Sequence, residues 1–309
     1  MGISLLSKPV RTFAGYFSRR QFIEPGGYLE IWRIAWPLII LSASNTVMML
    51  TNRIFLAHDS PEEIAAAMPA GQMFFTLMAF FLVTTSFTAT VIAQFHGADD
   101  RVGCVQAAWN GFYFGTIVAL LLAFTLPAGG AWIIAHNGHH PAIAAFETEY
   151  FTAMSPCAGF TCMELGFLSF FTGRGKTTLV AAIKIVGCLI SVPLNYILIF
   201  GKFGAPEMGV EGAAIATVIS RYVELAIVAG WTHSHKARNA FIVGAYRSMY
   251  IPGKLLRSIT IKGMPLLVNE FLWSSGMAVL NQCYSTCGLD VVPAMNICST
   301  LFNLGSVVY

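Results

Sequence analysis

The chain has 309 residues, of which 56% are hydrophobic and 11% are charged, and its mean hydropathy is +0.67. A soluble domain carries about 25% charged residues, so the composition excludes an ordinary soluble fold and indicates a protein that crosses a membrane several times. The net charge of +3 is too small to indicate a nucleic-acid partner. The seven cysteines lie mostly in apolar runs without metal-ligand spacing, so they predict neither a metal site nor a disulfide framework.

Residues 1–27 are basic and lack an apolar run of signal-peptide length, so they predict a cytoplasmic tail. Long apolar spans follow it, and an eighth begins near Val291; the seven complete spans cover residues 30–56, 65–95, 104–134, 143–172, 177–200, 211–232 and 259–283. Apolar runs of about 20 residues or more are typical of transmembrane helices. We therefore expect an all-α polytopic membrane protein.

Lys and Arg gather in alternate connections between these spans. Connections after odd-numbered spans hold almost none, whereas those after even-numbered spans hold Arg101, Arg174, Lys176, Lys236, Arg238, Arg247, Lys254 and Arg257. Cytoplasmic loops are enriched in Lys and Arg. The pattern predicts a cytoplasmic N-terminus in an integral protein of the bacterial cytoplasmic (inner) membrane.

The longest connection, residues 234–258, divides the chain into a six-helix N-lobe at 28–233 and the start of a C-lobe at 259–309, with helix 7 and part of helix 8. Pro37 and Pro265 occupy matching places in the first helix of each part, as in an internal repeat. The second copy stops inside its second helix. We therefore expect a fragment or a truncated product of a two-lobe protein.

Glu270 lies near the middle of the seventh span, and a carboxylate at bilayer depth costs at least about 2.5 kcal/mol, so it calls for a function. Ser274, Met277 and Asn281 fall on the same helical face. The first span carries a similar polar face that includes Asn45 and Asn52. We expect both faces to bind a cation or a substrate, although Glu270 could also be a structural acid.

Prolines inside the spans predict helix kinks at Pro37, Pro193 and Pro265. Pro193 frees a carbonyl close to the Asn195 amide, and together these groups can coordinate a cation or bind a substrate. Helix packing through a proline kink explains the same pattern equally well.

Four other charged residues lie at least seven residues from the ends of their spans. Arg221 and Glu224 are three residues apart and are expected to neutralise each other on one helical face. Glu164 and Lys184 are expected either to form a structural ion pair between helices or to provide a proton site.

Two segments resemble the MATE family of multidrug exporters: VIAQFHGADDR (Val91 to Arg101) and PLNYILIFGKFGAPEMGVEGAAIATVISR (Pro193 to Arg221). The resemblance implies a V-shaped monomer of two six-helix lobes in membrane lipid. It also implies export of cationic, lipophilic small molecules by alternating access, in exchange for Na⁺ or H⁺ and without another cofactor. Within this family the position of Asn52 often carries Asp, and Glu270 matches a family acid, which places the coupling role on Glu270.

Two alternatives to the antiporter remain, namely a lipid-linked oligosaccharide flippase of the same superfamily and an inactive membrane fragment. A flippase would have a larger and more basic central cavity, whereas only Lys184 and Arg221 supply positive charge deep within the spans. No catalytic constellation of side chains shares a helical face, so the sequence predicts no enzyme.

Overall fold

The computed structural model describes residues 27–59, 61–136, 141–234, 249–250, 253–286 and 298. These residues form a bundle of long α-helices without a strand. In chain order the elements are α2 (Tyr28–Asp59), α3 (Pro61–Gly97), α4 (Arg101–His136), α5 (Pro141–Thr172), α6 (Thr177–Ile199), the short 3₁₀-helix η2 (Lys202–Gly204), α7 (Gly209–Ser234) and α8 (Gly253–Thr286).

The all-α prediction is confirmed, and each of the seven complete spans matches one helix. The largest difference is at α8, which begins at Gly253 and thus takes in the last residues of the predicted 234–258 connection. Leu255 and Ile259 pack against a buried cluster with residues from each of the helices α3 to α7, which explains why the helix extends this far. Residues 1–26, most of the connection and the run that begins near Val291 lie outside the described residues.

Five of the described helices are long and apolar enough to cross a membrane: the segments are Ala35–Leu56, Ala70–Gly97, Arg101–His136, Thr177–Ile199 and Gly209–His233. The helices α5 and α8 are also long but are not among these five, and α5 carries buried acids. A charged helix of this kind is compatible with a membrane when its charges face the protein interior.

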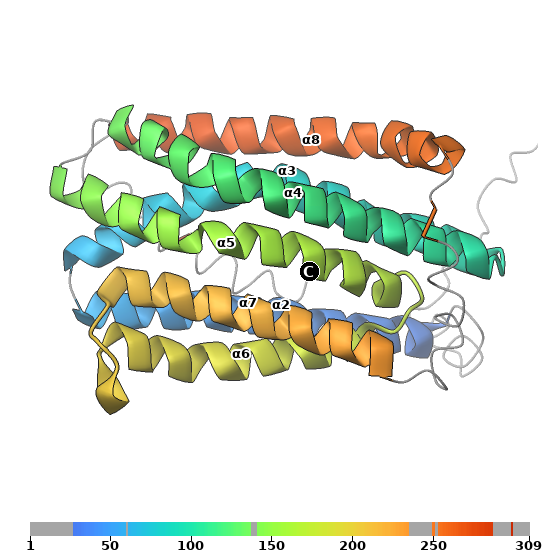
Figure 1. Ribbon diagram of the computed structural model, residues 1–309, viewed down its shortest axis with the longest axis horizontal. Helices are drawn as coiled ribbons and strands as arrows, with labels where there is room; N and C mark the ends of the chain where they lie inside the picture. Colours follow the sequence, from blue (N-terminus) through green and yellow to red (C-terminus); the bar gives the residue numbers. More distant parts are fainter. Residues whose placement is uncertain are drawn as a thin grey trace, which may run out of the picture.

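The helix α5 lies in the middle of the bundle and packs against α3, α4 and α7 (Figure 1). The helix α6 packs against α2 and α7 and has little contact with α5. Contacts of α2 with α3 complete the six-helix arrangement, and α8 lies on its outer side against α3. The helix α7 is therefore the element that joins α5 to α6.

A close approach of two backbones fixes the position of α5 against α4. A Cβ atom at Gly115 of α4 would lie 2.6 Å from the carbonyl oxygen of Cys162 on α5, so only glycine fits there. Small residues permit such approaches between membrane helices, where van der Waals contact drives association. Apolar side chains of α3, α4 and α5, including Met78, Leu122 and Phe151, fill the adjacent core.

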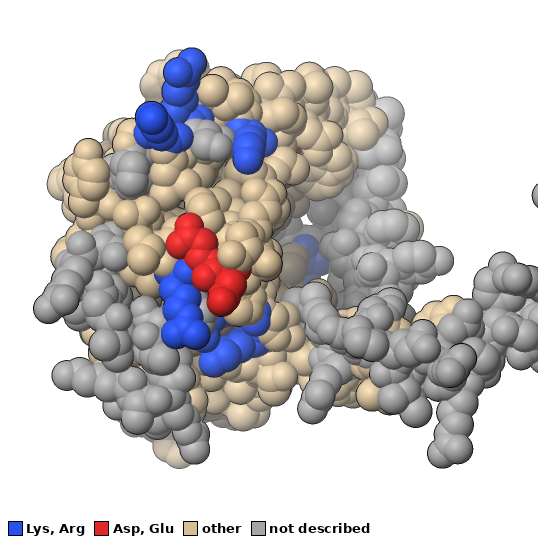
Figure 2. Space-filling view, turned by 90° about the vertical axis from the view of Figure 1, so that its right-hand side faces the viewer, with Lys and Arg blue, Asp and Glu red and all other residues tan. Residues whose placement is uncertain are grey.

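Basic residues gather at one end of the bundle. Figure 2 shows the end at which α4, α6 and α8 begin, and several Lys and Arg side chains lie on it. The sequence places Arg101, Arg174, Lys176, Lys254 and Arg257 at these helix starts or directly before them. At the opposite end, the turn 200–208 contains Lys202 as its one basic residue.

The three prolines predicted to kink helices lie inside continuous helices, Pro37 in α2, Pro193 in α6 and Pro265 in α8. Each removes a backbone donor without ending its helix. Their carbonyl partners four residues earlier are therefore available to other donors.

Candidate functional site

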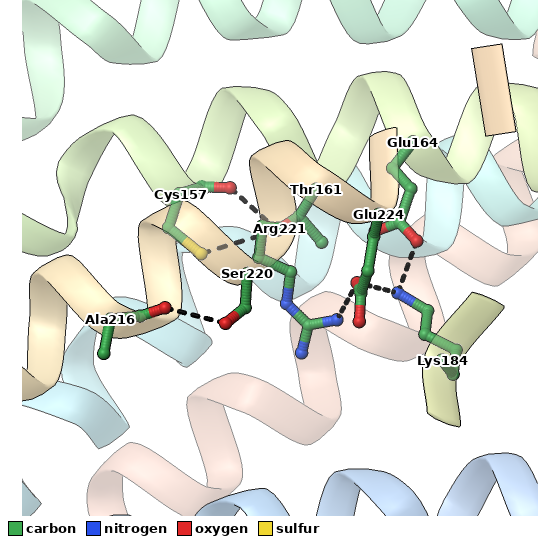
Figure 3. A network of polar contacts seen from close by, with 8 residues as sticks. All are labelled: Cys157, Thr161, Glu164, Lys184, Ala216, Ser220, Arg221 and Glu224. Atoms are coloured by element: carbon green, nitrogen blue, oxygen red, sulfur yellow. Dashed lines mark hydrogen bonds and ion pairs between the residues drawn. The ribbon is translucent and has the colours of Figure 1, made fainter. Parts of the chain in front are cut away.

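Four charged side chains form one buried network in the six-helix bundle (Figure 3). The Nζ atom of Lys184 on α6 lies 2.6 Å from Oε1 of Glu164 on α5 and 2.8 Å from Oε2 of Glu224 on α7. The Nη1 atom of Arg221 lies 2.7 Å from the same Glu224 oxygen. The network therefore connects three helices.

The network is almost completely removed from solvent. The side chains of Glu164 and Glu224 are 0% and 1% exposed, and those of Lys184 and Arg221 are 8% and 14% exposed. Two carboxylates face two cations, so the group is neutral as a whole. This pairing of opposite charges offsets the cost of burying them. Removing one partner of a buried ion pair typically lowers the free energy of unfolding by about 3–5 kcal/mol, because the other charge is left unpaired.

The two acids differ in the number of their partners. Glu224 contacts both Lys184 and Arg221, whereas Glu164 contacts Lys184 alone among the described residues. Oε2 of Glu164 and Oε1 of Glu224 are buried without a hydrogen-bond partner. The carboxyl group of Glu164 is thus the less stabilised of the two.

The surroundings of the network leave space for Glu224 but provide no additional donor. A Cβ atom at position 187 of α6 would collide with the Glu224 carboxylate, so Gly187 makes room for it. The hydroxyl groups of Thr161 and Ser220 donate to the backbone oxygens of Cys157 and Ala216, at 2.7 and 2.8 Å (Figure 3). These hydroxyls point along their own helices and do not reach the carboxylates.

A second polar group involves α2, α6 and α7. Nδ2 of Asn52 donates to the Thr217 hydroxyl at 3.4 Å, and Nδ2 of Asn195 donates to the backbone oxygen and the hydroxyl of Ser191 at 2.9 and 3.1 Å. The amide oxygens of Asn52 and Asn195 are buried without a hydrogen-bond partner. Amide oxygens with free lone pairs are suitable ligands for a cation or for a donor on a substrate.

Asn45 lies on the same face of α2 as Asn52, but its side chain is exposed. The structure therefore separates these two predicted ligands. Asn52 contacts the interior of the bundle, and Asn45 faces the outside of the described part of the chain.

The polar face of α8 lies apart from both groups, because α8 packs against α3. Glu270, Ser274 and Met277 are partly buried, whereas the adjacent Phe271 and Leu272 are each 65% exposed. The backbone of Asn281 is helical, and its side chain lies outside the described residues. Glu270 is thus not brought next to Asn52 or Asn195.

The structure confirms the predicted Arg221–Glu224 and Glu164–Lys184 pairs and joins them through a contact that sequence reasoning missed, Lys184 to Glu224. The three spans hold five acids against two bases, so their charges alone do not indicate a single network. Glu147 on α5 is a further buried acid, 1% exposed, that was not singled out.

An open pocket of about 800 Å³ lies between the end of α4 and the starts of α5 and α7. Alanines and Thr148 line much of it, together with Glu149 and Glu211. None of the predicted site residues borders this pocket, so it is separate from the polar groups described above.

Comparison with known proteins gives a consistent family. The MatE family model matches residues 37–197, just over half of the chain. The chain is 28% identical over 252 residues to a probable multidrug resistance protein NorM of Thermotoga maritima, covering 80% of this chain and 53% of the relative. It is 27% identical to the multidrug resistance protein MdtK of Edwardsiella ictaluri, covering 88% of this chain and 60% of the relative.

Solved structures show the same fold. A multidrug resistance MATE family transporter of the MOP superfamily, in an outward-facing conformation, superposes with a TM-score of 0.80 at 22% identity. A MOP superfamily transporter from Pyrococcus furiosus superposes with a TM-score of 0.79 at 21% identity. Each alignment covers 90% of this chain and 61% of the solved chain.

The chain thus spans roughly half to three fifths of the length of the relatives it matches. The family model covers most of α2 to α6, including Asn52, Glu164, Lys184 and Asn195, and ends before Thr217, Arg221 and Glu224. From the extent of this match and the shared fold, the chain belongs to the MatE family, whose members are membrane transporters and not enzymes.

Proposed function

We propose that the chain forms the N-lobe and the start of the C-lobe of a secondary antiporter that exports cationic, lipophilic small molecules in exchange for Na⁺ or H⁺ by alternating access. Its family and the multidrug resistance proteins among its relatives support export of varied small molecules. The protein acts as a monomer in the inner membrane, with a cytoplasmic N-terminus. The basic end of the bundle in Figure 2 supports that orientation.

The observation that carries the coupling proposal is the position of Glu270. Its carboxylate lies on the more buried face of α8, with Ser274 and Met277 on the same face and large apolar side chains on the other. An ionisable residue at membrane depth is a functional-site candidate, because its burial is costly. We assign to Glu270 the binding of the coupling ion or of the substrate cation.

Met277 suits the same site, since its flexible and polarisable thioether adapts to apolar ligands of different shapes. The unpartnered amide oxygens of Asn52 and Asn195 provide a second place for a cation. Asn52 cannot carry a proton, so this place would favour ion coordination over proton exchange.

The proposal is tested by ethidium efflux from cells that lack their own exporters, with and without Na⁺ and at pH 6 and 8. Since the relatives are longer, the assay uses the 309-residue chain and any longer reading frame that continues through the Tyr309 codon. Glu270→Gln is expected to abolish coupled efflux at unchanged expression. The matched control is Glu207→Gln, which alters an exposed acid in the 200–208 turn.

Wild-type efflux by the Glu270→Gln variant would overturn the assignment of Glu270. An absence of ion-dependent efflux in every wild-type form would overturn the antiporter proposal itself. The Na⁺ and pH series separates the two coupling ions, because only the true coupling ion changes the initial rate.

A further inference from the structure

We propose that Glu164 is a proton-carrying residue and that its protonation releases the ion pair through which Lys184 ties α6 to α5. This inference rests on the proposed antiport function, in which a proton taken up by the N-lobe shifts its helices. It gives the buried network a role in the transport cycle in addition to its role in packing.

The first argument is the unequal support of the two acids. If Glu224 were protonated, Arg221 would lose its carboxylate partner and remain buried beside Lys184. If Glu164 is protonated, both cations keep Glu224 between them. Adding a proton to Glu164 therefore leaves every remaining charge with an opposite partner, which is the less costly choice in a buried site.

The second argument is the free oxygen of Glu164. Its Oε2 atom is completely buried and has no hydrogen-bond partner among the described residues. The proton binds this oxygen and converts the carboxylate to the neutral acid, and it leaves from the same oxygen when the site reopens. No covalent bond other than the O–H bond forms or breaks.

The charged groups around Glu164 come from few elements. Lys184 on α6 and Arg221 and Glu224 on α7 face it, and Cys157 lies one and a half to two turns earlier on its own helix. Residues 64–95 of α3 and 105–135 of α4, the other helices packed against α5, contain no acid, base or cysteine, and Tyr113 is the one titratable side chain. The charge at Glu164 therefore depends on its partner Lys184 and on the neighbouring Arg221 and Glu224.

The third argument is that the Glu164–Lys184 ion pair joins α5 and α6, two helices that otherwise have little contact. The helix α5 packs against α3, α4 and α7, and α6 packs against α2 and α7. Glu164 and Lys184 reach across from one set to the other beside α7 (Figure 3). When Glu164 becomes neutral, α6 remains bound to α7 through Lys184 and Glu224 but loses its charged link to α5.

A row of polar side chains, which we call the polar seam, connects the Glu164–Lys184 ion pair to the second polar group around Asn52 and Asn195. We define the seam as Lys184, Ser191 and Asn195 on α6 with Thr217, Arg221 and Glu224 on α7. Lys184 and Asn195 are both buried, and they lie about 16 Å apart along α6 with an angular offset of about 20°. The helices run antiparallel, with Lys184 beside Glu224 and Leu198 beside Gly212, so Ser191 and Thr217 lie at similar levels.

A movement of α6 relative to α5 therefore also moves Asn195, whereas α2 brings Asn52 to Thr217. Protonation of Glu164 would thus change the relation between α5 and the helices that carry the amide oxygens. This provides a physical path from a proton in the network to the second cation place.

The test measures the distance between α5 and α6 by pulsed electron spin resonance. Spin labels are placed at the exposed positions Thr152 and Tyr196 in a cysteine-free background, and the distance is measured at pH 6 and pH 8. The wild-type network is expected to give a pH-dependent distance. Glu164→Gln, which mimics the protonated acid, is expected to give the low-pH distance at both pH values.

A double variant, Glu164→Gln with Lys184→Met, removes one charge of each sign and keeps the network neutral. It replaces the single variant in the distance measurement if Glu164→Gln folds poorly. It is expected to show the same loss of pH dependence. Glu207→Gln is the matched control and should behave as the wild type. A pH-dependent distance change of wild-type size in Glu164→Gln or in the double variant would overturn the proposal.

Efflux assays distinguish this failure from failure of the proposed function. Glu164→Gln should reduce the ratio of efflux rates at pH 6 and pH 8 to about one, whereas linkage to a single proton can change the rate by up to about tenfold per pH unit. If the wild type exports nothing but shows the pH-dependent distance that Glu164→Gln abolishes, the antiporter proposal fails and the release of α6 stands. If efflux is coupled to an ion but the distance between α5 and α6 does not change with pH, the proposed release of α6 is wrong and the antiporter proposal is unaffected.

Discussion

The interior of the bundle formed by α2 to α7 and the polar face of α8 surround a carboxylate in opposite ways. Glu224 is buried and held by two cations, because its Oε2 atom lies 2.8 Å from Nζ of Lys184 and 2.7 Å from Nη1 of Arg221. Glu270 lies on a helix that contacts α3 and otherwise exposes large apolar residues. From this difference we expect the bundle interior to depend on its charges for stability, and we propose that Glu270 on α8 has a different role.

The largest effect on stability is expected from removing the charge of Lys184, the cation that contacts both acids. Lys184→Met leaves two buried carboxylates with Arg221 alone, and we expect a loss of about 3–5 kcal/mol in the free energy of unfolding, as for other broken buried pairs. Thermal unfolding in detergent and the yield of folded protein measure it. Adding Glu164→Gln should recover most of the loss, and a single variant as stable as the wild type would contradict the role of the network.

A smaller effect is expected from Gly187→Ala. The new methyl group collides with the Glu224 carboxylate, and overpacking of this kind costs about 1–3 kcal/mol. The control is Gly230→Ala on α7, where a Cβ atom meets nothing within 4 Å. Thermal unfolding of the two variants should differ clearly, and equal stability would show that Glu224 can move aside.

Asn52 is an intermediate case between Glu224 and Glu270, because its amide oxygen is buried but carries no charge. Asn52→Ala removes one long hydrogen bond to Thr217, so we expect a loss of about 0.5 kcal/mol. Asn45→Ala on the same face of α2 is the exposed control and should leave the stability unchanged. Chemical unfolding resolves the difference, and a loss at position 45 equal to that at position 52 would refute the distinction.

The smallest effect on stability is expected from Glu270→Gln. The side chain is only partly buried on a helix with few contacts, so the free energy of unfolding should change by no more than about 0.5 kcal/mol. Efflux, in contrast, should be lost. A large destabilisation by Glu270→Gln would place this acid in the same class as Glu224 and remove the contrast between the two regions.

Sequence patterns predicted the helices well because each span is long, apolar and bounded by turn residues. Asp100 illustrates such a boundary, since its carboxylate accepts a hydrogen bond from the Gly103 amide at 2.9 Å and caps the start of α4. At α8 the predicted start was six residues late, because Leu255 extends the packed face beyond the apolar run that begins at Ile259.

The interactions between helices were harder to predict. The neighbouring pair Arg221 and Glu224 follows directly from helical spacing. The contact of Lys184 with Glu224 depends on how α6 and α7 are aligned, and that alignment comes from tertiary features. Gly212 packs against the Leu198 carbonyl, and the Met208 amide donates to the same oxygen at 3.0 Å. Helical periodicity alone contains no information about such an alignment.

The turn between α6 and α7 also has a consequence for biosynthesis. It occupies residues 200–208, contains a left-handed Gly201, and closes with the Met208 to Leu198 hydrogen bond. The two helices can therefore form a hairpin as soon as they leave the ribosome. Lys184 and Arg221 would then enter the bilayer with Glu224 between them, which avoids part of the cost of about 2.5–3.5 kcal/mol that each charge would incur alone. In this way the short turn would make a strongly charged hairpin insertable.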